Sequence, residues 1–231
     1  MNRRKFISTC TCCAFASAGA VFLSKNNHLI NSSEKITRIR IHIAEHCNLK
    51  CKCCNHFSPI AQKEFYDLDK FTQDMERMSF IFKDKLKEVY LLGGEPLLNP
   101  QVNKYVEYTR KYFPNVNIFI STNGTLLDSM DETFWETLNK NNAFITPSIY
   151  PVKIDWASIL DKAKKYNVKI YACPVDKIEL TMGNIDKFRK DIFVKSRLIE
   201  NPPSSIKRPK CERKNECYCM YNGRLYPCAI I

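Results

Sequence analysis

The sequence predicts an α/β fold, a partial (β/α)6 barrel whose parallel sheet is built from strand–helix units. Short apolar or alternating segments typical of strands recur between segments with helical spacing of apolar side chains. Such alternation, with helical segments of about 10–15 residues, is typical of βαβ units and a parallel sheet. Five or six units are too few for a closed eight-unit barrel of typical length. We therefore expect a curved, incomplete barrel that carries a small cysteine-rich extension at its C-terminus.

The expected elements follow one another in alternating order. Asp67 precedes the first expected helix and is a typical N-cap residue. The strands and helices are expected at residues 36–43 (strand), 68–82 (helix), 89–92 (strand), 102–113 (helix), 116–121 (strand), 131–139 (helix), 143–148 (strand), 156–166 (helix), 168–172 (strand) and 185–198 (helix).

Composition indicates a globular protein with an excess of positive charge. Of the 231 residues, 45% are hydrophobic and 26% are charged, and Lys and Arg outnumber Asp and Glu by 36 to 24. This charge permits anionic partners. No basic stripe with interleaved aromatic residues stands out, so the sequence gives no evidence for binding to nucleic acid.

The N-terminal residues have the pattern of an export signal. Paired arginines (Arg3 and Arg4) precede an apolar stretch of small residues, and together they resemble a twin-arginine leader. We interpret residues 1–24 as this signal-like leader and the polar residues 25–35 as a linker.

A dense cysteine cluster follows the first expected strand. Cys47, Cys51 and Cys54 have the spacing CxxxCxxC, with Cys53 inside the run. Thiolates are the ligands of iron–sulfur clusters and of zinc. Three ligands to a four-iron cluster leave one iron open to another molecule. The position after a strand is also where open α/β folds and barrels place their chemistry.

A second group of cysteines lies near the C-terminus, in residues 201–231. This segment is too short for a core of its own, so we expect a metal or cluster to stabilise it. The candidate ligands are Cys211, Cys217, Cys219 and Cys228. A zinc site with the same four cysteines is the alternative, and the end of the chain at Ile231 suggests that the segment is incomplete.

The order of three motifs resembles the radical SAM enzymes. The cysteine motif is followed by Gly93-Gly94-Glu95-Pro96 after the second expected strand and by Ser121-Thr122-Asn123-Gly124 after the third. The resemblance covers residues 36–200. The C-terminal cysteines resemble the start of a SPASM or twitch extension, which carries auxiliary iron–sulfur clusters.

The resemblance implies an activity and its cofactors. In this family the three cysteines hold a [4Fe-4S] cluster that binds S-adenosylmethionine (SAM) and cleaves it reductively to a 5′-deoxyadenosyl radical, which abstracts hydrogen from a substrate. By the same resemblance, residues 93–96 contact the methionine amino group, Thr122 and Asn123 contact nucleoside or substrate, and Ser148 binds the methionine carboxylate. An electron donor of the flavodoxin or ferredoxin type is implied as a partner.

Several alternatives stay open at this point. The substrate is a peptide or protein, as auxiliary clusters suggest, or a carbohydrate or nucleotide-derived small molecule. A non-catalytic zinc or iron–sulfur protein is the alternative from another class. Cys53 replaces an aromatic residue found in many relatives and is a rival ligand, and His46 and His56 flank the same loop. The chemistry favours a cytoplasmic location, whereas the leader favours export or membrane association.

Overall fold

The computed structural model describes residues 36–51, 54, 56–172, 178–188, 218–221 and 223–226. Strands and helices alternate in them, as the sequence predicts. Their bounds are β1 (Arg38–Ala44), α2 (Leu68–Phe82), η1 (Lys83–Lys85), β2 (Glu88–Gly93), η2 (Pro96–Leu98), α3 (Val102–Tyr112), β3 (Asn117–Thr122), η3 (Leu127–Ser129), α4 (Glu132–Lys140), β4 (Ala143–Pro147), α5 (Trp156–Lys165), β5 (Tyr218–Tyr221) and β6 (Arg224–Tyr226), where η denotes a short 3-10 helix.

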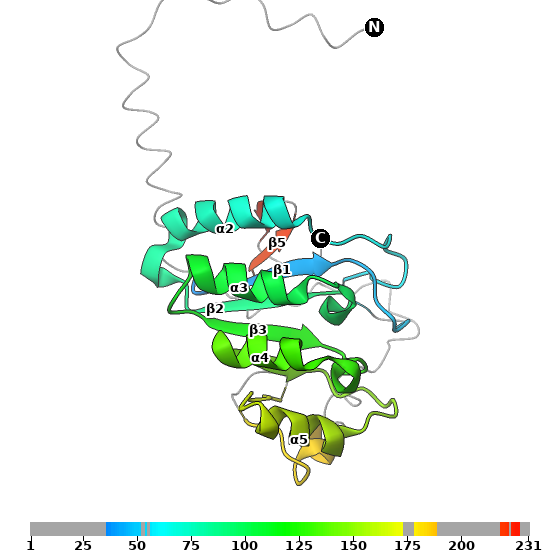
Figure 1. The fold of residues 1–231 in the computed structure, drawn as a ribbon. Helices are drawn as coiled ribbons and strands as arrows, with labels where there is room; N and C mark the ends of the chain where they lie inside the picture. The colour runs from blue at the N-terminus through cyan, green and yellow to red at the C-terminus, as the bar shows by residue number, and fades with distance from the viewer. Residues whose placement is uncertain are drawn as a thin grey trace, which may run out of the picture. The chain divides into compact units, whose positions relative to one another are not determined.

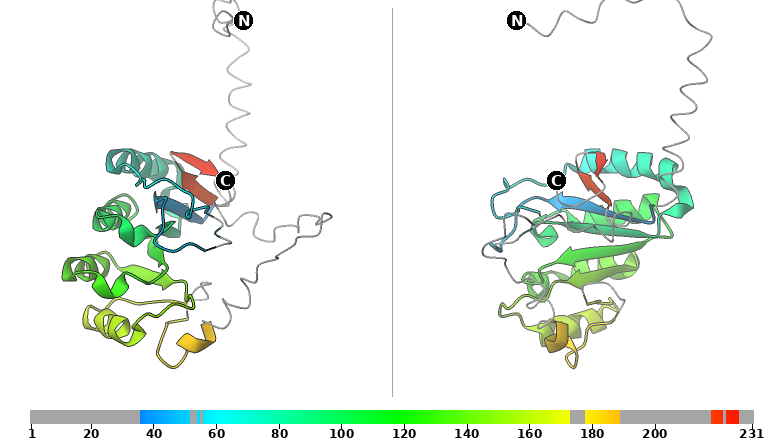
Figure 2. Two further views of the ribbon diagram at one scale, coloured as in Figure 1. Left: turned by 90° about the vertical axis from the view of Figure 1, so that its right-hand side faces the viewer. Right: turned by 180° about the vertical axis from the view of Figure 1, so that it is seen from behind.

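The strands form one sheet in the order β4-β3-β2-β1-β5-β6. The five strands β4, β3, β2, β1 and β5 are parallel to one another, and β6 runs antiparallel to its neighbour β5. The helices α2 to α5 lie side by side on one face of this sheet (Figures 1 and 2). The predicted α/β fold with a parallel sheet is thereby confirmed. Because the strands are parallel, the loops that leave their carboxyl ends share one edge of the sheet.

Helix α2 shows how the sequence produces these elements. The Asp67 side chain accepts a hydrogen bond from the Lys70 backbone amide (2.9 Å), so the predicted N-cap is confirmed. Phe71, Met75 and Met78 recur at helical spacing and are buried. The apolar stripe of the helix therefore packs on the sheet, and its other residues face away.

The main core lies between the helices and the sheet. Ile39, Ile41 and Ile43 of β1 are fully buried there. Side chains alternate along a strand, so Arg40 and His42 lie on the opposite face. That second face carries a separate aromatic row, described with the site below.

The structure differs from the expected elements at three places. Residues 168–172 form only isolated bridges at Ile170 and Tyr171 rather than a strand. Of the helix expected over 185–198, only 185–188 lie within the described residues, and they are helical. No strand was predicted in the tail segment, yet β5 lies there and pairs directly with β1, and its Cys219 and Met220 are buried. Burial in the main sheet thus stabilises this part of the tail.

Two predicted regions lie outside the described residues: the leader and linker of residues 1–35, and most of the tail of residues 201–231. Among the helices that are described, none is long and apolar enough to cross a bilayer.

Gly93 provides a test of how closely β2 packs against β1. Gly93 has φ of +146°, and a Cβ added there would lie 1.9 Å from the Ala44 carbonyl oxygen. We expect Gly93→Ala to lower stability by about 2 kcal/mol or more. This corresponds to a fall of about 4–8 °C in Tm, measured by thermal unfolding.

Gly183→Ala is the matched control. A Cβ at Gly183 meets only the Thr181 hydroxyl oxygen, at 3.8 Å. We expect this variant to stay within about 0.5 kcal/mol of the wild type. Equal Tm values for the two variants would contradict the close packing of β2 on the residues that follow β1.

Candidate functional site

The three cysteines of the CxxxCxxC motif lie on the loop that leaves β1. Cys47, Cys51 and Cys54 are free thiols and are partly buried. Cys51 and Cys54 are joined by a backbone hydrogen bond, in which the Cys54 amide donates to the Cys51 carbonyl (3.3 Å). Burial raises the pKa of the Cys51 thiol, and the nearby Cys47 and Cys54 raise it further. The structure therefore brings the three predicted ligands together.

The donor set fits a cluster with three cysteine ligands. Among the described residues, no three His, Cys, Asp or Glu side chains converge on a single metal ion. The fit rests on the chemistry of the donors, because three partly buried thiols lie near one another on one loop and thiolates are the ligands of iron–sulfur clusters.

The two histidines that flank the loop contact neighbouring rings. His46 packs against Phe65, with ring centroids 5.0 Å apart, and His56 meets His42 edge to face at 4.8 Å. Burial, and after it charge repulsion from His42, lower the pKa of His56 to about 4. The rival ligand Cys53 lies outside the described residues.

Glu95 of the Gly-Gly-Glu-Pro motif joins the ends of β2 and β3. Its side chain is fully buried. One carboxylate oxygen accepts hydrogen bonds from the Thr122 hydroxyl (2.6 Å) and the Leu97 amide (3.1 Å), and the other accepts from the Asn123 amide (2.7 Å). Burial raises the pKa of Glu95, while these three donors oppose the rise. The two predicted cofactor motifs are thus joined in one hydrogen-bonded group, the Glu95 unit, which consists of Glu95, Leu97, Thr122 and Asn123.

Asn123 joins this unit to the cysteine loop. Its side-chain amide nitrogen donates to the Cys47 sulfur (3.5 Å) and to Asn48 Oδ1 (2.7 Å). Burial raises the pKa of the Cys47 thiol, while the Leu49 amide and the Asn123 side chain both act to lower it. Thr122 and Asn123 were predicted to contact nucleoside or substrate, and in this structure their polar atoms bind other parts of the protein.

The glycines of the same motif lie directly against the residues before Cys47. The Gly94 amide donates to the Ala44 carbonyl (2.8 Å), and the Glu95 amide donates to the His46 carbonyl (3.0 Å). A Cβ at Gly94 would lie 2.1 Å from the His46 carbonyl oxygen. The glycines therefore permit close approach of two backbones, and the contact of residues 93–96 with SAM stays a prediction.

Ser148 lies where β4 ends, at the same edge of the sheet. Its amide donates to the Thr122 carbonyl (2.8 Å), which places it beside the Glu95 unit. Its role toward the methionine carboxylate stays a prediction. Tyr150 follows on the same loop, and the sequence analysis missed it. Burial raises the pKa of Tyr150 to about 12, and the charges of Cys51, Cys54 and Cys47 contribute to the rise. The signal that identifies Tyr150 is its place just beyond a strand end.

The face of the sheet away from the helices carries an aromatic row. Tyr90 stacks on Phe119 with centroids 4.7 Å apart, and Phe119 and Tyr171 both contact Phe144. Arg40 lies over the Tyr90 ring, with its guanidinium carbon 5.7 Å from the centroid. The row extends across β2, β3 and β4 to Tyr171.

Two arginines of β1 on this face differ in their partners. Arg38 forms an ion pair with Glu88 at 2.5 Å. Arg40 contacts the face of the Tyr90 ring, and it makes no hydrogen bond or ion pair with any residue that the structure describes. Its charge is therefore not neutralised within the part of the chain that the structure describes.

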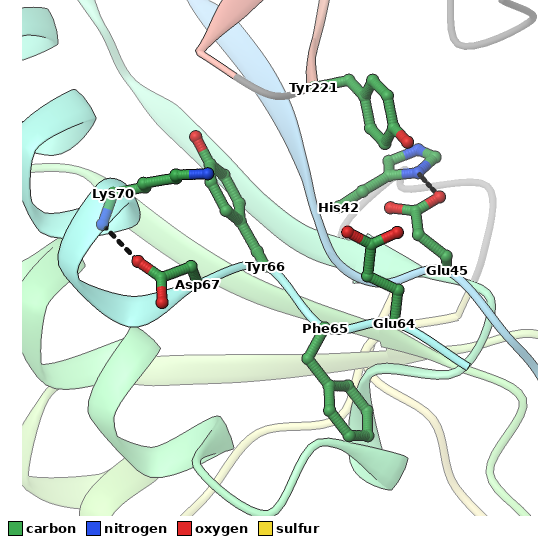
Figure 3. Close-up of a pocket in the computed structure, with 8 residues that line it drawn as sticks. All are labelled: His42, Glu45, Glu64, Phe65, Tyr66, Asp67, Lys70 and Tyr221. Atoms are coloured by element: carbon green, nitrogen blue, oxygen red, sulfur yellow. Dashed lines mark hydrogen bonds and ion pairs between the residues drawn. The ribbon is translucent and has the colours of Figure 1, made fainter. Parts of the chain in front are cut away.

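A small pocket lies beside His42, at the seam between β1, β5 and the start of α2 (Figure 3). Tyr221 and Glu45 flank the His42 ring, and the Glu45 carboxylate lies 3.6 Å from its Nδ1. Burial alone would lower the pKa of His42, but Cys219 and Glu45 raise it to about 9. The volume of about 60 Å³ is far below the roughly 300–1,000 Å³ of small-molecule sites. We therefore do not assign this pocket to the substrate.

Of the four predicted tail ligands, Cys219 alone lies in the described residues. It is fully buried in β5, in register with Arg40 of β1. Cys211, Cys217 and Cys228 lie outside the described residues. The auxiliary cluster or zinc site at these four cysteines stays a prediction.

Comparisons with known proteins give the same family. A GTP 3′,8-cyclase from Nautilia profundicola is 26% identical over 93 residues, which cover 40% of this chain and 29% of that protein. Another, from Sulfurimonas denitrificans, is 26% identical over 102 residues, or 44% of this chain and 32% of that protein. The chain thus matches about a third of the length of these curated relatives.

A solved structure shares the fold. The crystal structure of BtrN in complex with AdoMet and 2-DOIA has a TM-score of 0.51 at 18% sequence identity, covering 84% of this chain and 74% of that one. The family model "Radical SAM superfamily" matches residues 41–179, which is more than half of the chain. With the cysteine loop, the Glu95 unit and the parallel sheet in place, the chain belongs to the radical SAM superfamily.

Proposed function

We propose that this chain is an enzyme that binds a [4Fe-4S] cluster and SAM and acts on a small anionic substrate. One observation carries the enzyme assignment. Three free cysteines lie on the loop after β1, and Glu95 and Asn123 tie that loop to the ends of β2 and β3. A structural metal site requires only its ligands, whereas this arrangement also fixes two further strand ends beside them.

The parts of the site have separate tasks in this proposal. Cys47, Cys51 and Cys54 would hold the cluster. When bound, cluster and SAM together supply a 5′-deoxyadenosyl radical for hydrogen abstraction. The protein contributes orientation and exclusion of water, because a reactive radical must be kept from side reactions.

SAM would lie beside the predicted motifs at the edge where the strands end. Residues 93–96 and Ser148 are the proposed contacts for its methionine part. The Gly94 amide donates to the Ala44 carbonyl, just before the cysteine loop, and the Ser148 amide donates to the Thr122 carbonyl of the Glu95 unit. This proximity supports the proposal that they bind one ligand.

The sheet face away from the helices is the proposed substrate side. Arg40 supports an anionic substrate, since a guanidinium binds carboxylate or phosphate through paired hydrogen bonds. The two curated relatives described above are GTP 3′,8-cyclases, which favours a phosphorylated nucleotide among such substrates. The peptide alternative depends on the tail cysteines and has no support from the described residues.

The proposal also implies a reductant and a location. The radical SAM superfamily generally requires an electron donor, and we propose one of the flavodoxin or ferredoxin type. Supply of SAM and of such a donor favours the cytoplasm. The signal-like leader is the observation that favours export instead.

The enzyme assignment is tested by anaerobic reconstitution. We expect the wild type to bind about four irons and to release 5′-deoxyadenosine from SAM when dithionite is added. The triple variant Cys47→Ala/Cys51→Ala/Cys54→Ala removes all three ligands and should lose both the iron and the product.

Cys53→Ala is the matched control for the ligand register. It removes a cysteine from the same loop and should keep both cluster and product. If Cys53→Ala loses the cluster instead, the assigned register is wrong. If the wild type binds zinc and releases no 5′-deoxyadenosine, the enzyme assignment is wrong and the chain is a non-catalytic metal-binding protein.

The substrate assignment is tested with GTP and guanosine as probes. We expect the wild type to bind GTP more tightly than guanosine, and Arg40→Gln to weaken GTP binding about tenfold or more, since a hydrogen bond to a charged group contributes about 1.5–3 kcal/mol. Binding is measured by calorimetry with the reconstituted protein.

The exposed Arg77 gives the control, Arg77→Gln, which should leave both affinities unchanged. Equal loss of guanosine binding in Arg40→Gln would show that Arg40 does not act through the phosphates. Failure of the wild type to bind GTP would overturn the nucleotide assignment and leave the anionic class to other probes.

A further inference from the structure

The sulfur of Cys47 receives two N–H donors from the protein. The Leu49 amide donates at 3.4 Å, and the Asn123 side-chain amide donates at 3.5 Å. The first comes from the cysteine loop itself. The second comes from the residue that directly follows β3 and is far away in sequence, so it links the first predicted cluster ligand to the end of a strand.

The orientation of the Asn123 side chain is fixed by its other partners. Asn123 Oδ1 accepts from the Thr125 amide (2.9 Å) and from the Thr125 hydroxyl (2.6 Å). Asn48 Oδ1 accepts from Asn123 Nδ2. If the oxygen and nitrogen of the Asn123 amide were exchanged, its NH₂ group would face the N–H of Thr125 and its oxygen would face the oxygen of Asn48. The network therefore requires the NH₂ group to face Cys47.

The backbone of the same residue is held independently. The Asn123 amide donates to the buried Glu95 carboxylate at 2.7 Å. Asn123 is 5% exposed, so little water competes with its contact to the sulfur. Both backbone and side chain are thus fixed before any cofactor binds, which is the condition for a positioning residue.

We propose that Asn123 is a positioning residue for Cys47, and that its N–H···S contact raises the reduction potential of the cluster. This inference rests on the proposed function, because it needs the cluster. Hydrogen bonds to cluster sulfurs are one of the factors that set the reduction potential. A donor stabilises the more negative, reduced state more than the oxidised state. In a site with low exposure this effect is larger than in water.

The proposal assigns Asn123 a task other than contact with nucleoside or substrate. Its side-chain oxygen is already bound twice by Thr125, and its nitrogen faces Cys47 and Asn48. The Glu95 unit then acts on the cluster through Asn123, because Glu95 holds the backbone from which this side chain extends.

The test compares reduction potentials of the reconstituted protein without SAM or substrate, by titration followed with electron paramagnetic resonance. Asn123→Asp keeps the size of the side chain and the acceptor for Thr125, and replaces the donor to Cys47 by an acceptor. We expect a more negative potential, with the one-electron equilibrium constant changed about tenfold, or 59 mV. Asn123→Ala removes the donor to Cys47 together with the contacts to Asn48 and Thr125, but places no acceptor against the sulfur. It should shift the potential in the same direction by less.

Two further variants separate this effect from general disturbance. Asn141→Asp makes the same chemical change at a buried amide that caps the end of α4 at the Thr137 carbonyl, and its potential should match the wild type. Asn48→Ala removes a hydrogen-bond partner of Asn123 and the acceptor that the free Cys47 thiol contacts at 3.8 Å, which a cluster-bound thiolate does not use, but it leaves the donor from Asn123 to Cys47. If Asn123 only holds the loop, Asn48→Ala and Asn123→Ala will change the potential alike, and the proposal is overturned.

A second measurement does not need the cluster. Iodoacetamide labelling of the apoprotein, read for each cysteine by mass spectrometry, reports how readily each thiolate forms. We expect Cys47 in Asn123→Asp to react several-fold more slowly relative to Cys51 than in the wild type. An unchanged ratio overturns the proposal. If the wild type binds no cluster, the proposed function fails, and this ratio still tests the contact by itself.

Discussion

The buried carboxylate of Glu95 is the interaction on which the site depends. A carboxylate without exposure to water is costly unless it is fully hydrogen-bonded. Three donors offset that cost here, from Leu97, Thr122 and Asn123. Two of them belong to the end of β3 and one follows β2, so the ends of two neighbouring strands cannot shift without breaking bonds to a buried charge. A neutral side chain at this position would hold the strand ends less firmly.

The cysteine loop depends on the same edge of the sheet. Its approach to β2 requires glycine twice, because a Cβ at Gly93 or Gly94 would overlap backbone of Ala44 or His46. On its other side, Asn123 binds the loop through Cys47 and Asn48. The loop itself has few regular hydrogen bonds within the described residues. Its position therefore comes from the strands around it, and a change at Gly93, Glu95 or Asn123 should reach the cysteines.

Much of the fold could be predicted from local sequence. Helix α2 has the predicted bounds, because Asp67 caps it and its buried residues recur at helical spacing. Strand β5 could not be found this way, because a four-residue strand has little pattern and pairs with β1 far away in sequence. Residues 168–172 have the composition of a strand, yet pairing is confined to isolated bridges. Strand formation depends on the neighbour as well as the segment.

The candidate site shows the same limit. The cysteine spacing and the order of the glycine and asparagine motifs predict the family, since each motif is local and follows a strand. The contact of Asn123 with Cys47 and the position of Tyr150 depend on how strand ends meet in space. The predicted contact of Asn123 with nucleoside or substrate therefore stays a prediction, and the structure is needed to give the orientation of its side chain.

The charge on the proposed substrate side depends on two arginines that share one strand face. Arg38 is paired with Glu88, whose carboxylate also accepts from the Tyr90 hydroxyl (3.2 Å), so this charge is used within the protein. Arg40 lies one step closer to the cysteine loop and has no carboxylate partner among the described residues. Burial lowers the pKa of His56 most, and the charges of His42 and Arg40 lower it too, whereas Glu45 raises it, so groups of both signs act near that loop. A ligand that brings a negative group to this face would neutralise the charge of Arg40, whereas a neutral ligand would leave Arg40 desolvated and unpaired.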